Sequence, residues 1–232
     1  AGVRGKALSR LPASGFERMS MGRTHLIVDC GGTNTSAPLA FEMSCGRERL
    51  FVNCGAHPLD DEWQDALRCS GAHSAVTLSN RNVDVGCTMR SDDVVRQDDK
   101  DFILLEASHD GYVRMNGFTH TRRLYLCAQG DDLRGEDILS AAAKPSRAVD
   151  AAIRFHLHPK VMVSLIRDGQ EALIRMPGGI GWRFHHDAGV LALEDSVYMG
   201  QGCTPRKSKQ LVIYGQVRER EASVKWAVQR EG

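Results

Sequence analysis

The stretch "RFHLHPKV", residues 154–161, shows the alternation of apolar and polar residues that decides the fold. Successive side chains of a β-strand point to opposite faces. Phe155 and Leu157 therefore share one face, and Arg154, His156 and His158 share the other. A strand of this kind buries its apolar face in a core and presents its polar row outward. The stretch predicts a core strand of a β protein.

The polar row of this strand has three interpretations. His156 and His158 could supply two zinc ligands, but no Cys, Asp or Glu nearby in the sequence completes a metal site. The row could instead form a ledge that binds an acidic ligand, or it could be a structural face in contact with water. We expect a polar face that contacts a partner domain or an acidic sugar, with Arg154, His156 and His158 as the substrate-binding residues.

Similar short segments recur along the chain, separated by glycine-rich or aspartate-rich turns such as "RDGQ" (167–170). They are HLIVDC, RLFVNC, SAVTL, DFILLEAS, RRLYLCA, KVMVSLI, EALIRM, GWRFHH, VLALEDSVYM, QLVIYGQV and SVKWAV. Helical periodicity is limited to "LDDEWQDALR" (59–68), where Asp60 or Asp61 can cap the helix and Trp63 and Leu67 share a face. We predict an all-β fold, namely a large two-sheet antiparallel β-sandwich with at most one or two short helices.

Length and charge limit the organisation and the partners. A chain of 232 residues can fold as one large β domain, and we predict a single domain over 15–232 that follows an N-terminal arm, 1–14. The formal net charge of +1 gives no whole-molecule argument for nucleic acid or a membrane surface, so we expect neither as a partner. The first residues lack the hydrophobic segment of a signal peptide, and a chain that begins with Ala1 fits a processed or excised piece.

The cysteines do not indicate a metal knuckle or a disulfide framework. There are seven of them, widely scattered and never in a CxxC pair, so we expect mostly buried free thiols. The acidic run "GDDLRGED" (130–137) lacks the regular spacing of a calcium loop and predicts an exposed turn with solvated carboxylates. The basic run "PRKSK" (205–209) predicts a solvated loop. In "SHDGYVRMNGFTHTRR" (108–123), Asp110-Gly111 predicts the turn between two paired strands.

A series of motifs in one order resembles a known family. They are SGFERMSMGRTHLIVDCGG, LAFEMSCGRERLFVNCGAHPLDDEWQDALRCSGAHSAVTL, EASHDGY, HTRRLYL, RGEDIL, RFHLHP, GWRF, EDSVYMG and VKWAV. Together they resemble the C-terminal β-sandwich domain of the heparinase II/III-like family, from about Gly15 to Trp226. The resemblance implies a polysaccharide lyase architecture in which an α/α toroid precedes the sandwich. It also implies β-elimination on uronic-acid-containing glycans such as glycosaminoglycans, and a place in the cell envelope or periplasm.

The resemblance also implies where the active-site edge lies. Aligning on "LAFE" (39–42) places Thr33 and Thr35 at the family's two histidine positions and Ala37 at its acidic position. Asn53 falls at the position of the metal-binding aspartate, and His73 at that of the third ligand. Zinc prefers His, Cys and carboxylate ligands, so a site at Asn53 and His73 looks degenerate, and we assign no catalytic residue.

Two hypotheses for the function follow. In the first, the chain is the sandwich half of a lyase, and the toroid domain of a longer parent chain supplies the main base and acid. In the second, it is a non-catalytic carbohydrate-binding or structural sandwich with a degenerate active-site edge. An acidic polysaccharide is the expected partner in the first, and the threonines at 33 and 35 favour the second for this chain alone. Whether the chain is an enzyme stays open here.

Overall fold

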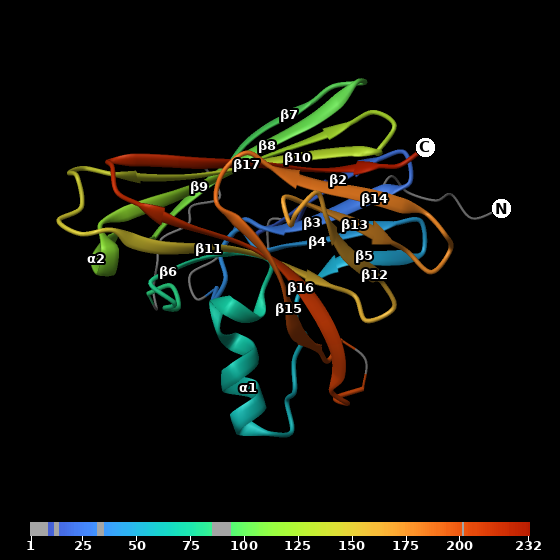
Figure 1. The fold of residues 1–232 in the computed structure, drawn as a ribbon, viewed down its shortest axis with the longest axis horizontal. Coiled ribbons are helices and arrows are strands. Elements are labelled where there is room, and N and C mark those ends of the chain that lie inside the picture. Colours follow the sequence, from blue (N-terminus) through green and yellow to red (C-terminus); the bar gives the residue numbers. More distant parts are fainter. Residues whose placement is uncertain (1–8, 12–13, 32–34, 85–93, 201) are drawn as a thin grey trace.

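Two antiparallel sheets face each other and form a β-sandwich (Figure 1). The computed structural model describes residues 9–11, 14–31, 35–84, 94–200 and 202–232. Helix α1 (Asp61–Arg68) projects downward from the sandwich in Figure 1. The predicted all-β sandwich with two short α-helices is therefore confirmed.

The first sheet contains nine strands in the described part of the chain. In spatial order they are β1 (Arg10–Leu11), β2 (Phe16–Met21), β3 (Thr24–Asp29), β4 (Phe41–Cys45), β5 (Glu48–Val52), β11 (Val149–Leu157), β16 (Arg206–Val217) and β15 (Val190–Tyr198), and β6 (Val76–Leu78) pairs with β11. The opening stretch lies on β11, which pairs with β5, β6 and β16. Two residues of the predicted N-terminal arm, Arg10 and Leu11, pair with β2. The boundary after residue 14 stays a prediction.

The second sheet contains eight strands in the same described ranges. Their spatial order is β12 (Met162–Ile166), β13 (Glu171–Arg175), β14 (Gly181–His186), β17 (Glu221–Arg230), β10 (Asp132–Ala141), β9 (Phe118–Cys127), β8 (Phe102–Tyr112) and β7 (Val95–Asp98). The "RDGQ" segment joins β12 to β13, and Arg167, Asp168 and Gly169 there have positive φ. The predicted Asp-Gly turn thus closes a hairpin.

Aromatic side chains from both sheets meet in the core. Trp226 of β17 stacks on Phe41 of β4, with ring centroids 5.6 Å apart, and its edge meets Phe155 of β11 at 4.8 Å. Phe155 also packs against Phe184 of β14 at 4.9 Å. The inward positions predicted for Phe155 and Leu157 are confirmed, and Trp226 is buried with them, since each is at most 2% exposed. This contact of large rings fixes the spacing of the two sheets.

Short helices lie outside the sheets. Helix α1 (Asp61–Arg68) begins after Asp60, whose carboxylate accepts a hydrogen bond from the Trp63 amide at 3.0 Å, as the sequence predicts. The 3-10 turn η1 (Ser70–Ala72) follows it, and α2 (Val113–Asn116) connects β8 to β9. None of the helices in the described ranges is long and apolar enough to cross a membrane. The six cysteines there are free thiols, and three of them are buried, whereas Cys87 falls outside these ranges.

Two predictions of local structure are wrong. Strand β8 continues through Asp110-Gly111 to Tyr112, with a register shift after His109, and α2 makes the turn instead. Gly117, at φ 80°, ends α2 in the left-handed conformation that favours glycine. The basic run at 205–209 is also largely a strand, because β16 begins at Arg206 and pairs with β15.

The prediction of an exposed turn with solvated carboxylates at 130–137 is also wrong, because most of this segment forms β10 and Asp137 is buried at 3% exposure. Arg122 of β9 donates to both oxygens of Asp137, at 2.7 and 3.1 Å, and the indole N–H of Trp226 donates to Oδ2 at 2.9 Å. Burial alone would raise the pKa of Asp137, but the Arg122 charge and the His120 hydrogen bond outweigh it and hold the pKa well below its usual range. The two charges are therefore a permanent ion pair in the core.

Two histidines extend this network. His120 contacts Asp137 Oδ1 through Nε2 at 2.8 Å, and its Nδ1 lies 3.0 Å from His109 Nε2. Burial lowers the pKa of both imidazoles, and it lowers that of His109 well below its ordinary value. The chain of contacts satisfies polar groups that would otherwise destabilise the sandwich interior.

Gly135 provides a direct test of the packing in this region. A Cβ atom at Gly135 would lie 2.1 Å from Cζ2 of Trp226, whereas one at Gly215 of β16 would meet nothing within 4 Å. We expect Gly135→Ala to lower the free energy of unfolding by about 1–3 kcal/mol, since overpacking forces core side chains to shift. The matched variant Gly215→Ala should leave it unchanged or raise it by about 0.5 kcal/mol. Urea unfolding measures both, and equal effects would contradict this packing.

Candidate functional site

A cavity of about 340 Å³ lies at the edge that the sequence predicts to be the active site. It is lined by Phe16, Ile27, Asp29, Thr35, Ser36, Ala37, Ala40, Glu42, Asn53 and His73. The structure thus brings Asn53 and His73 together with Thr35 and Ala37, while Thr33 lies outside the described residues. Asp29 and Glu42 also line the cavity, and the sequence reasoning missed both. Asp29 ends β3 directly before Cys30-Gly31-Gly32, and that strand end was the available signal.

Internal hydrogen bonds hold Asn53 in place at the end of β5. Its side-chain Oδ1 accepts a hydrogen bond from the Ser74 backbone N–H at 2.9 Å, and its backbone N–H donates to Glu42 Oε1 at 3.1 Å. The Ser74 hydroxyl in turn donates to the Val52 carbonyl at 3.0 Å. The amide oxygen that would face a ligand is therefore already used to join β5 to the segment before β6.

His73 and Asp29 line this cavity together with a third ionisable group, Glu42. The Nδ1 of His73 lies 3.0 Å from the Cys69 carbonyl, so Nδ1 carries the proton and Nε2 keeps the lone pair. Burial lowers the pKa of His73, which keeps the imidazole neutral near pH 7. Asp29 accepts the Thr35 hydroxyl at 2.6 Å and the Gly31 amide at 3.4 Å. Burial raises the pKa of Asp29, and these hydrogen bonds offset part of the rise.

The donor set does not fit a zinc ion. Zinc in proteins takes three or four ligands from His, Cys and carboxylate groups. In the described ranges, no group of three or more His, Cys, Asp or Glu side chains is placed so that it could hold a metal ion. Asn53 and Asp29 already accept hydrogen bonds from Ser74 and Thr35. We therefore derive no chemical step through a metal at this edge.

The polar row of β11 is not a single outward-facing ledge. His156 is 3% exposed, with Nδ1 2.8 Å from the Ser196 hydroxyl and Nε2 3.0 Å from the Gly71 carbonyl. The side chain of Arg154 is 12% exposed and lies 3.8 Å from Glu194. The expectation of a water-facing row is wrong for His156, because η1 and β15 supply its partners. That His156 and Arg154 contact substrate stays a prediction.

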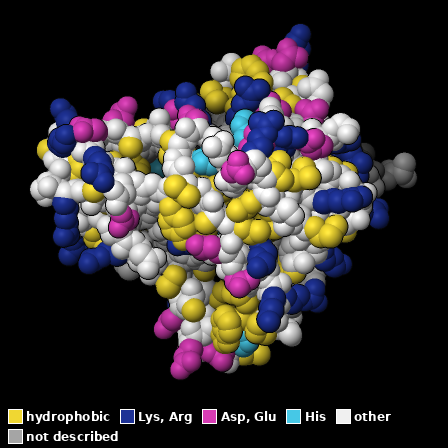
Figure 2. Space-filling view, viewed as in Figure 1, with side chains coloured by type: hydrophobic (Ala, Val, Ile, Leu, Met, Phe, Trp, Pro, Cys, Tyr) yellow, Lys and Arg dark blue, Asp and Glu magenta, His cyan; other side chains and the backbone are white. Residues whose placement is uncertain are grey.

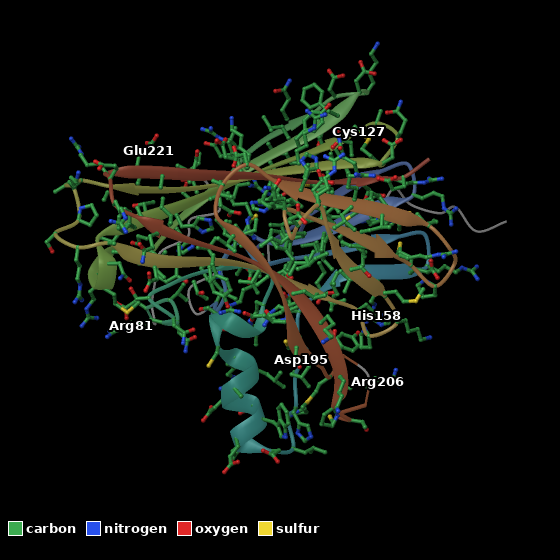
Figure 3. The ribbon with its side chains drawn as sticks, viewed as in Figure 1. Arg81, Cys127, His158, Asp195, Arg206 and Glu221 are labelled. Carbon is green, nitrogen blue, oxygen red and sulfur yellow. The ribbon has the colours of Figure 1, made fainter. Side chains whose placement is uncertain are left out.

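His158, at the end of the row, lies in a different environment. Its ring packs edge-on against Tyr198, with centroids 5.1 Å apart, and the Tyr198 hydroxyl accepts a hydrogen bond from Arg49. Burial, followed by the positive charges of Arg49, Lys160 and Arg206, lowers the pKa of His158. We call Arg49, His158, Lys160, Tyr198 and Arg206 the His158 cluster. Figure 3 places His158 and Arg206 at the same lower end of the molecule.

The cations of the His158 cluster have no acidic partner. Within the described residues, Arg49, Lys160 and Arg206 make no ion pair, whereas arginines such as Arg10, Arg123 and Arg134 do. Figure 2 shows Lys and Arg side chains at the lower right, where this cluster lies. A half-buried imidazole beside unpaired cations is an arrangement that an anionic ligand would stabilise.

Comparisons with known proteins support a common family. Residues 3–227 match the family model described as "Heparinase II/III-like, C-terminal". The chain is 35% identical to FtsZ-localized protein C of Caulobacter vibrioides (strain NA1000 / CB15N), over 95% of this chain and 43% of that protein. Among solved structures it resembles the heparan sulfate lyase HepC of Pedobacter heparinus, with a TM-score of 0.79, 14% identity, and coverage of 97% of this chain and 36% of that one. The heparinase III BT4657 gene product matches at a TM-score of 0.78 and 16% identity, with coverage of 97% and 36%.

The pH dependence of stability follows from His156. Burial, the largest cause, lowers its pKa to about 4, whereas an unfolded chain has a value near 6.5. Between these values the unfolded state binds more protons, so the free energy of unfolding falls as the pH falls from about 6.5 to about 4, by up to ~3 kcal/mol from this residue. In urea unfolding across this pH range, the free energy of unfolding should change less with pH in His156→Asn than in the parent chain. The control His185→Gln should keep the pH dependence of the parent chain. The same pH dependence in His156→Asn would contradict the assignment of this effect to His156.

Proposed function

We propose that this chain is a non-catalytic sandwich domain that binds acidic glycans. The chain belongs to the heparinase II/III-like family and matches its C-terminal domain. The chain spans less than half of its curated relative and about a third of the lyases that share its fold. A longer parent protein, with a toroid before the sandwich, is consistent with these proportions. The family and the fold are the premise, and the activity and the ligand are the proposal.

The cavity at the family's active-site edge supports the absence of catalysis. β-Elimination needs a base to remove the proton at C5 and groups to neutralise the uronate carboxylate. The resemblance implies ionisable side chains at positions 35 and 37, where this chain has Thr35 and Ala37. The Thr35 hydroxyl donates to Asp29. The neutral His73 has its Nδ1 directed to the Cys69 carbonyl.

The His158 cluster is the single observation that supports binding of an acidic polymer. Guanidinium groups bind carboxylate and sulfate in a planar, two-point geometry, and Arg49 and Arg206 are free of ion pairs among the described residues. The half-buried His158 ring lies beside them, and the buried Tyr198 accepts a hydrogen bond from Arg49. The cluster therefore provides positive charge for a uronic-acid-containing glycan.

The named relative supports a role for the parent protein. Identity of 35% over 95% of this chain is far above the 14% and 16% found with the two lyases. We propose that the longer parent localises with FtsZ, as the name of that relative indicates for that protein. The rival hypothesis is that the parent is an active lyase whose toroid carries the main base and acid.

The test combines binding and turnover for the same sample. We expect heparan sulfate, chondroitin sulfate or alginate to bind in isothermal titration calorimetry, with no rise in the ultraviolet absorbance of unsaturated uronate. Arg49→Ala and Arg206→Ala should each weaken binding by about tenfold, the loss of one charge-assisted contact. Lys144→Ala removes a cation that is paired with Glu219 outside the cluster and should leave binding unchanged.

Two outcomes would contradict the proposal. A rise in absorbance that depends on this chain would show that it is a lyase. Binding that is unaffected by both arginine variants would show that the His158 cluster is not the site. Addition of zinc should change neither binding nor absorbance, because the donor set at Asn53 and His73 does not fit the metal.

A further inference from the structure

The half-buried ring of His158 follows the last residue of β11 and is subject to the charges of three cations. They come from three parts of the chain, namely Arg49 from β5, Lys160 from the turn after β11 and Arg206 from the first position of β16. Burial, and then these positive charges, lower the pKa of His158. The free chain therefore holds a neutral imidazole among cations near pH 7.

Tyr198 of β15 fixes the position of Arg49 relative to this ring. The tyrosine is 3% exposed, and its ring meets His158 edge-on with centroids 5.1 Å apart. Its hydroxyl accepts a hydrogen bond from Arg49. A Cβ atom at Gly200 would lie 2.2 Å from the same hydroxyl oxygen, so glycine there leaves room for it. One buried side chain thus contacts both the imidazole and the guanidinium.

The hydrogen bonds of His158 determine where a second proton binds. Its Nδ1 accepts the Lys160 backbone N–H at 3.4 Å, so the neutral ring carries its proton on Nε2. Its backbone N–H donates to the Leu50 carbonyl at 3.0 Å, and its carbonyl accepts the Val161 N–H at 2.9 Å. A proton on Nδ1 would break only the long contact with Lys160 and would leave these backbone bonds in place. The ring can therefore become cationic without a change in the strand.

Carboxylates next to the cluster in the sequence are bonded elsewhere. Glu48, which precedes Arg49, accepts the Gly178 backbone N–H at 2.8 Å. Asp195 of β15 is paired with Lys209 at 2.7 Å. Among the described residues, no carboxylate contributes to the pKa shift of the ring. The charge that would stabilise an imidazolium has to come from a bound anion.

The cluster therefore couples two events, the binding of an anion and the protonation of its imidazole. A negative group beside Arg49 and His158 offsets the repulsion between them and favours the charged ring. We infer that His158 gains a proton when the His158 cluster binds an acidic glycan, so that binding becomes tighter as the pH falls. The ligand in this inference rests on the proposed function, and the inference adds that the same site responds to pH.

The direction of the pH effect follows from linkage. The pKa of His158 is lowered from its ordinary value of 6.5 in the free chain, and a bound anion raises it. Between the two values the complex holds more protons than the free chain, so the affinity increases as the pH falls through this range. The carboxylates of the glycan titrate near pH 4 and below, so they stay ionised above about pH 5.5.

The experiment measures binding of heparan sulfate, chondroitin sulfate and alginate by isothermal titration calorimetry at pH 7.5 and 5.5. We expect at least one polymer to bind, about tenfold more tightly at pH 5.5. Titrations at pH 6.5 in MES and in bis-tris, which differ in ionisation enthalpy, should show uptake of roughly half a proton. His158→Gln should bind equally at both pH values without proton uptake. The control His185→Gln changes a half-buried histidine on β14 and should keep both effects.

Three outcomes would contradict the inference. Equal binding at both pH values without proton uptake overturns it and leaves the proposed function intact. Proton uptake that persists in full in His158→Gln overturns it as well, because another group then takes the proton. Failure of all three polymers to bind at either pH overturns the proposed function and the inference together. Proton uptake is measured first on the unmodified chain, so the test does not depend on whether a variant folds.

Discussion

The buried ion pair between Asp137 and Arg122 is the constraint on which the rest of the structure depends. Both side chains are at most 2% exposed, and a charge left unpaired at that depth would cost several kcal/mol. The pair therefore requires β9 and β10 to keep their register and requires Trp226 to direct its N–H to Asp137. Gly135 makes room for that indole. One desolvated carboxylate thus sets the packing of the second sheet against the first.

Arg122 also connects the core to the candidate site. Its Nη1 donates to the Leu39 carbonyl at 2.7 Å and the Ser74 carbonyl at 3.0 Å, and its guanidinium lies over Phe41. Leu39 belongs to the segment between β3 and β4, and Ser74 follows His73 directly. Two segments that line the 340 Å³ cavity are therefore held from inside the sandwich. The backbone that carries Thr35, Ala37 and His73 is thus fixed by bonds that do not involve those side chains.

Sequence reasoning predicted features that depend on neighbours in the chain. Alternation identified the strands, and Asp60 identified the start of α1 through a contact three residues away. It failed where the partner is distant. The burial of Asp137 depends on Arg122, fifteen positions away on another strand, and that of His156 depends on Gly71 and Ser196. The resemblance placed Asn53 and His73 at one edge, but the outer-face cavity that Tyr125 and Arg134 line on the second sheet needs the register of five strands, which no single segment contains.

The most direct test of this account is a double-mutant cycle on the pair, made with Arg122→Met, Asp137→Asn and the double variant. Urea unfolding and amide hydrogen exchange would be measured on all of them. The account predicts that each single variant loses about 3–5 kcal/mol because it leaves one charge buried alone, and that the double variant recovers more than about 1.5 kcal/mol of the summed loss. Exchange at the amides of Ala40 and Ser74 should still be faster in the double variant, since the bonds from Arg122 to Leu39 and Ser74 are gone. Additive losses, together with unchanged exchange in these two segments, would contradict the claim that this pair organises both the core and the site.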